Sequence, residues 1–112
     1  MEFSVRANEQ VIRILRRVPL VNMAMWEGVK AIIDKFAMTP EEHAAVKWTP
    51  IDGMPRSFSF DPTARLEREL TGDETAFLLR VIDSPPAGLE WTFETVVVRN
   101  EIVTALGGQS WE

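Results

Sequence analysis

The chain has 112 residues, of which 17 are acidic and 12 basic, so its formal net charge is −5 at neutral pH. Its length and its 46% content of hydrophobic residues predict one folded domain over residues 1–112. The absence of cysteine excludes disulfides, thiolate metal sites and thiol catalysis. No apolar run is long enough to span a membrane and no signal-peptide pattern is present, so we expect a cytoplasmic protein.

Two helices are predicted at the start of the chain. Apolar residues at helical spacing indicate the first over residues 8–17, which ends near Pro19 because proline disfavours helical geometry in the residue before it. The second covers residues 22–37 and has the clearest apolar stripe of the chain. Asn22 is a suitable N-cap for this second helix.

A short third helix is predicted over residues 40–45. The hydroxyl of Thr39 and the carboxylate of Glu42 have the spacing of a capping box, with proline at the first helical position. This helix carries His43, the only histidine, directly after the carboxylates of Glu41 and Glu42. A small enzyme that uses His43 as a general base is one hypothesis, but the sequence identifies no nucleophile, so we favour a surface histidine.

Strand periodicity replaces helical periodicity after the third helix. Residues 46–48 and 56–60 alternate polar and apolar side chains around the turn-forming residues 50–55, which predicts a β-hairpin. A third short strand is predicted at residues 66–70. Its charged side chains, including Arg68, are typical of a solvated strand edge.

The C-terminal third contains two further predicted helices. The first begins at a second capping box, formed by Thr71 and Glu74, and ends before Ser84. Residues 89–106 have both a helical stripe and many β-branched residues, and we interpret them as a helix because of their length and the glycines that follow. Residues 107–112 are expected to form a loose tail.

These elements predict an α+β fold, with about five helices packed on a small antiparallel β-hairpin or three-stranded sheet. Trp26 widens the apolar stripe of its helix and is expected in the core. The other residues expected in the core are Val11, Leu15, Val29, Ile33, Phe36, Trp48, Phe58, Phe77, Leu78 and Val81.

Two sets of side chains are candidates for binding. Arg6, Arg13, Arg16 and Arg17 form an N-terminal basic cluster that can contact phosphates, although the acidity of the whole chain favours a solvated face. Trp91 follows a loop and Trp111 lies beyond the terminal glycines, so both are candidates for exposed anchors in a protein interface.

The order of the elements resembles that of small proteins encoded by tailed bacteriophages and prophages, most of them without assigned function. The segment ILRRVP at residues 14–19 resembles the end of their first helix, and FAMTPEEH at residues 36–43 is similar to their F-S-x-E-E-H segment. A tryptophan-bearing hairpin, an acidic segment and two helices follow in the same order. The resemblance implies a phage or prophage origin and an α+β fold, but no catalytic residue.

The leading hypothesis is a non-enzymatic protein-binding module, in which the acidic C-terminal third steers a basic partner. A phage accessory or host-modulating factor is the form that the resemblance suggests. A nucleic-acid-binding regulator that uses the arginine cluster is the alternative, and a structural subunit of an assembly is also compatible. We expect no catalytic residue, no cofactor and no metal site, and a homo-oligomer remains open.

Overall fold

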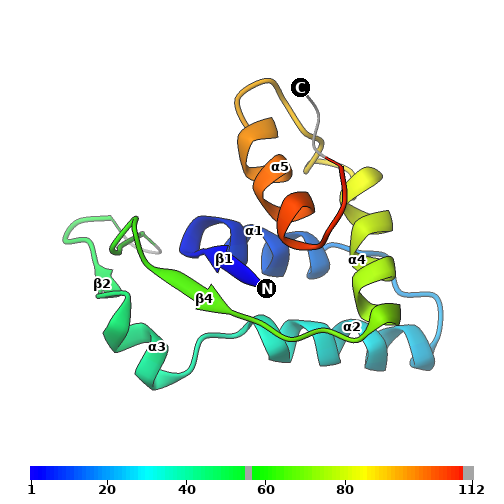
Figure 1. The fold of residues 1–112 in the computed structure, drawn as a ribbon, viewed down its shortest axis with the longest axis horizontal. Coiled ribbons are helices and arrows are strands. Elements are labelled where there is room, and N and C mark those ends of the chain that lie inside the picture. The colour runs from blue at the N-terminus through cyan, green and yellow to red at the C-terminus, as the bar shows by residue number, and fades with distance from the viewer. Residues whose placement is uncertain (55–56, 110–112) are drawn as a thin grey trace.

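The computed structural model describes residues 1–54 and 57–109, which form five helices and four short strands. The α+β class and the five helices are therefore confirmed (Figure 1). None of the helices in these ranges is long and apolar enough to cross a bilayer. In chain order the elements are β1 (Glu2–Ser4), α1 (Val5–Leu15), α2 (Met23–Phe36), α3 (Pro40–Ala45), β2 (Thr49–Pro50), β3 (Phe58–Ser59), β4 (Arg65–Glu67), α4 (Gly72–Asp83) and α5 (Val96–Ala105).

The strands form two separate two-stranded antiparallel sheets. One is the predicted hairpin, in which Thr49 of β2 pairs with Ser59 of β3. The predicted third strand also exists, but it pairs with β1, where Phe3 lies opposite Leu66. The sequence did not indicate β1, because three residues are too few for a strand pattern to emerge.

Helix α1 begins and ends earlier than the sequence predicted. The hydroxyl of Ser4 accepts a hydrogen bond from the N–H of Ala7 at 3.1 Å, and this cap starts the helix at Val5. The same hydroxyl donates to a carboxylate oxygen of Glu101 at 2.7 Å, which joins the start of α1 to α5. The last helical residue is Leu15.

Helices α2, α3 and α4 match their predicted caps. The side chain of Asn22 accepts a hydrogen bond from the N–H of Met25 at 2.8 Å. Both capping boxes are present, because the hydroxyls of Thr39 and Thr71 and the carboxylates of Glu42 and Glu74 make reciprocal bonds with backbone N–H groups. Local hydrogen bonding of this kind depends only on neighbours in the chain, so the sequence reveals it.

The last helix is shorter than predicted. Residues 89–95 are not helical, and α5 covers only Val96–Ala105. Thr92 and Thr95 explain the late start, since the N–H of each donates to the other's hydroxyl and closes a turn before the helix. Gly107 ends the helix with a positive φ of 81°, as expected for a glycine stop. Residues 110–112 of the expected tail lie outside the described residues.

The main core lies where α1 meets α2, α4 and α5, as Figure 1 shows. A smaller second core contains Val5, Val46 and Leu66 and lies beneath the hairpin. Five of the residues expected in the core are buried, and Ile33, Trp48, Phe77 and Val81 are half-buried. The five are Val11, Leu15, Val29, Phe36 and Leu78.

The core prediction is wrong for Trp26 and Phe58. Trp26 lies on a flank of α2 that the other described elements leave open, and it is 46% exposed. Phe58 is 39% exposed because its strand is only two residues long and stands apart from the main core. The hairpin also begins later than predicted, since Val46 is the C-cap of α3 and not a strand residue.

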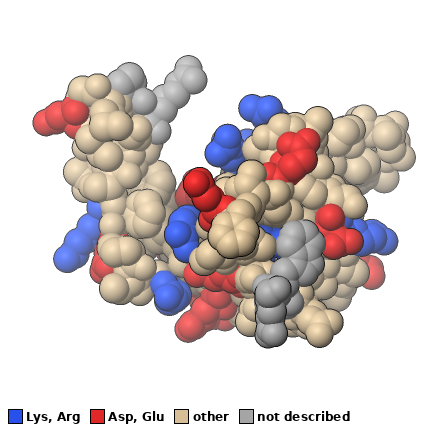
Figure 2. Space-filling view, turned by 90° about the horizontal axis from the view of Figure 1, so that it is seen from above, with Lys and Arg blue, Asp and Glu red and all other residues tan. Residues whose placement is uncertain are grey.

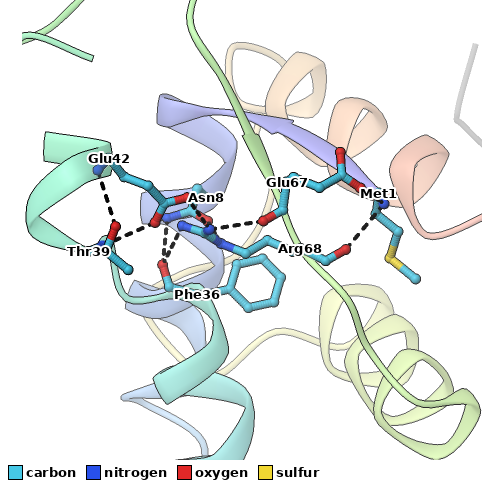
Figure 3. A network of polar contacts seen from close by, with 7 residues as sticks. All are labelled: Met1, Asn8, Phe36, Thr39, Glu42, Glu67 and Arg68. Atoms are coloured by element: carbon cyan, nitrogen blue, oxygen red, sulfur yellow. Dashed lines mark hydrogen bonds and ion pairs between the residues drawn. The ribbon is translucent and has the colours of Figure 1, made fainter. Parts of the chain in front are cut away.

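Arg68 is buried, although the sequence indicated a solvated strand edge, and it connects four segments (Figure 3). Its Nε donates to Oδ1 of Asn8 at 3.0 Å, and its Nη1 donates to Oε2 of Glu42 at 2.6 Å. Further bonds reach the carbonyl oxygens of Glu67 at 3.0 Å and Phe36 at 3.2 Å. The Phe36 oxygen also accepts from Nδ2 of Asn8 at 2.9 Å, so each group in this buried site has a partner.

We expect Arg68→Met to lower the free energy of unfolding by about 3 kcal/mol, because the substitution leaves Asn8, Glu42 and the Phe36 carbonyl without their shared donor. Urea denaturation followed by circular dichroism measures this change. Arg65→Met is the matched control, since Arg65 is exposed on β4, just before Arg68 in the chain, and is expected to change stability by less than about 0.5 kcal/mol. Equal effects of the two substitutions would contradict the central role of Arg68.

The same site predicts how stability depends on pH. Burial opposes the ionisation of Glu42, but the hydrogen bonds from Arg68 and from the Thr39 N–H outweigh it, and the pKa of Glu42 lies below its ordinary value of 4.5. Stability from this carboxylate is therefore complete above that value and is lost as the pH falls through the lowered pKa. We expect Glu42→Gln to be less stable than the wild type at neutral pH and the difference to shrink in acid. Urea denaturation across a pH series checks this, and a constant difference would contradict it.

Candidate functional site

The four arginines of the predicted basic cluster are all exposed, but only two of them share a site. Arg6 and Arg13 lie two turns apart on α1 and line one hollow of about 420 Å³. Arg16 and Arg17 follow the last helical residue and are not among the residues that line this hollow. The structure therefore divides the cluster into a pair beside the hairpin and a pair at the end of α1.

Aromatic side chains of the hairpin region form the opposite wall of the hollow. Trp48, Phe58 and Phe60 line it, and the ring of Trp48 stacks with that of Phe58 at 4.8 Å and with that of Phe60 at 5.9 Å between centroids. Figure 2 shows the molecule indented between the hairpin lobe at the left and the helical body, with basic side chains on the side of the body. The sequence did not place these aromatic residues near the arginines, because more than thirty residues of the chain separate Arg13 from Trp48.

His43 is exposed on α3, and its ring stacks with Trp48 at 5.9 Å between centroids. This contact gives the histidine a packing role at the base of the hairpin. In the described part of the chain, no group of three or more His, Asp and Glu side chains is arranged to hold a metal ion.

Of the two candidate tryptophan anchors, Trp91 is half-buried against the main core. Its indole N–H donates to the carbonyl oxygen of Ile82 at 2.7 Å, so the side chain attaches the 89–95 loop to the end of α4. Trp111 lies outside the described residues. The protein-binding role assigned to these two residues stays a prediction.

Among the tryptophans in the described part of the chain, Trp26 is the exposed one. Together with Leu20, Val21 and Met23 it lines a shallow apolar hollow on one flank of α2, and Val21 is 79% exposed. In the sequence, Trp26 widens the apolar stripe of this helix, and for that reason it was expected in the core. The width of the apolar stripe was the available signal of exposure, because the stripe is wider than the single face that a helix needs to bury.

The opposite flank of α2 borders a groove of about 400 Å³, which α4 closes on its far side. Small residues form much of the α2 wall, because Ala24, Gly28 and Ala31 carry little or no side chain. The side chain of Phe77 comes from α4. The remaining lining residues are Met25, Val29, Ile32, Asp73 and Glu74.

The two carboxylates of this groove differ in their surroundings. The hydrogen bond from Lys35 and the N–H of Thr71 hold the pKa of Glu74 below its ordinary value, so this carboxylate is ionised and paired. Asp73 is exposed at the start of α4 and makes no side-chain hydrogen bond or ion pair with the described residues. The groove therefore combines apolar walls with one carboxylate that is available to a ligand.

Comparisons of the chain with protein-family models, with curated proteins and with solved structures gave no match. The functional assignment below therefore depends on the chemistry and geometry of these surfaces.

We expect Trp91→Phe to lower the free energy of unfolding by about 1 kcal/mol, because the phenyl ring keeps most of the packing but leaves the Ile82 oxygen without its donor. Urea denaturation measures the change. Phe93→Ala in the same loop is the control, since Phe93 is 95% exposed and its loss is expected to cost less than about 0.5 kcal/mol. An unchanged stability of Trp91→Phe would show that the indole bond contributes nothing.

Proposed function

We propose that this chain is a non-enzymatic protein-binding module that holds a segment of a partner protein in the groove between α2 and α4. The observation that carries the proposal is the groove itself, whose walls are apolar except for Asp73 and Glu74. Grooves of this kind accept the apolar face of an amphipathic helix, whose anchors recur every three or four residues. The methyl group of Ala24 and the absence of a side chain at Gly28 leave room for such anchors.

Charge indicates the chemistry of the partner. Asp73 stands at the groove without a partner among the described residues, and α4 belongs to the acidic C-terminal third, which carries seven acidic and two basic residues in positions 71–112. A basic segment gains favourable electrostatic steering toward such a surface. The occupant that fits is therefore an amphipathic segment with Lys or Arg beside its apolar anchors.

The other flank of α2 supports the same interpretation. Exposed Trp26 and Met23 lie within one turn of each other, and tryptophan is among the residues enriched at the centre of protein interfaces. A monomer seldom exposes several large apolar side chains together unless they contact another molecule. A partner that is larger than one helix can contact both flanks of α2.

The resemblance to small phage and prophage proteins extends the proposal to a biological setting. In that setting the chain is an accessory factor that acts on a protein in the cytoplasm of a bacterial host. The groove chemistry and the phage setting are separate parts of the proposal, and the experiment below tests the groove.

The groove is tested by selecting binders for the wild-type protein from a library of random peptides. We expect the selected peptides to combine apolar residues at helical spacing with Lys or Arg. Their affinity is expected to fall at least tenfold for Gly28→Leu, measured by fluorescence anisotropy. A Cβ added at Gly28 meets no atom within 4 Å, and leucine favours the helix more than glycine does, so this variant blocks the groove without unfolding the protein.

Three further variants sharpen the result. Asp73→Asn is expected to lower the affinity for basic peptides about threefold. Glu69→Gln is expected to leave that affinity unchanged, because the carboxylate of Glu69 is exposed but does not line the groove. Peptides that bind Gly28→Leu as tightly as the wild type, but lose affinity with Trp26→Ala, would move the site to the other flank. Self-association that Gly28→Leu abolishes, measured by light scattering, would identify a second copy as the occupant and contradict a basic partner.

A further inference from the structure

The hollow between α1 and the hairpin contains two cationic side chains that the fold does not use. Arg6 and Arg13 are exposed, line the same hollow, and make no side-chain hydrogen bond or ion pair with the described residues. Arg68, in contrast, is buried and uses its donors in hydrogen bonds that hold the fold together. Arginine presents a planar set of donors that matches the oxygens of a phosphate group.

The aromatic wall of this hollow is held in place from behind. Trp48 and Phe60 pack against the second core, which contains Val46 and Leu66. Phe58 stacks on Trp48 and is 39% exposed, whereas Trp48 and Phe60 are half-buried. An aromatic ring that is fixed on one side and accessible on the other provides a stacking surface for a nucleobase.

We propose that this hollow binds single-stranded nucleic acid, with one base stacked on the aromatic wall and the flanking phosphates at Arg6 and Arg13. The proposal concerns a second site and does not depend on the groove between α2 and α4. Stacked rings beside unpaired guanidinium groups are the two components that single-strand-binding surfaces combine. A duplex fits less well, because its bases already stack on each other and only its phosphates remain available.

Glu9 makes the proposal more specific. Its side chain also lines the hollow, so two arginines against one carboxylate give a net charge of +1 there. Removing this carboxylate raises the net charge to +2. Nucleic acid is therefore expected to bind Glu9→Gln more tightly than the wild type, a gain that loss of folding does not produce.

The test is fluorescence anisotropy with a labelled oligodeoxythymidylate of about ten nucleotides at low salt. We expect Arg13→Gln and Phe58→Ala each to weaken binding about fivefold or more, and Glu9→Gln to strengthen it about threefold. With two phosphate contacts the plot of log affinity against log salt has a slope of about −1.4, which falls to about −0.7 for Arg13→Gln. Circular dichroism confirms that each variant is folded.

Matched controls come from the same chain. Arg16→Gln removes an exposed arginine that does not line the hollow, and Phe93→Ala removes an exposed phenylalanine from the 89–95 loop, so both are expected to bind like the wild type. An equal loss in Arg16→Gln and Arg13→Gln would overturn the site, as would the absence of oligonucleotide binding at millimolar protein. Duplex DNA of the same length that binds as tightly would overturn base stacking. Equally tight binding of adenosine monophosphate would assign the hollow to a free nucleotide instead.

Discussion

The buried guanidinium of Arg68 is the interaction on which the arrangement of the N-terminal half depends. Its donors reach Asn8 on α1, the carbonyl of Phe36 at the end of α2 and the carboxylate of Glu42 on α3. A charge removed from water is stable only when every one of its donors has a well-placed acceptor. The positions of these segments are therefore coupled, and β4 is coupled to them because Arg68 directly follows its last residue.

Two of the coupled helices, α1 and α2, each form one wall of a surface proposed for binding. The carbonyl of Phe36 joins the end of α2 to Arg68. The earlier turns of this helix expose Trp26 on one flank and border the groove on the other. The hairpin follows α3 and lies beside α1, so that aromatic rings of the hairpin region line one hollow with Arg6 and Arg13. Charge separates the surfaces, since unpaired arginines mark one and Asp73 marks the other.

Features determined by neighbours in the chain were predictable. The capping boxes at Thr39 and Thr71 and the N-cap at Asn22 gave correct helix starts, because each is a hydrogen bond within four residues. The hairpin was predicted from alternation and turn residues. The start of α1 was missed because Ser4 caps it directly after a short strand, and the start of α5 was missed because paired threonines replace a helical turn.

By itself, the sequence determined the α+β class, five helices, most of their caps and five of the buried core residues. Only the tertiary structure decided which apolar and charged side chains remain exposed, because exposure depends on contacts between segments far apart in the chain. For this reason Trp26 was expected in the core but is 46% exposed, and Arg68 was expected at a solvated edge but is buried. Among the described residues, four segments supply hydrogen-bond acceptors around the arginine. The hollow that Arg13 and Phe58 both line was hidden in the same way, since local periodicity carries no information on which distant surfaces come together.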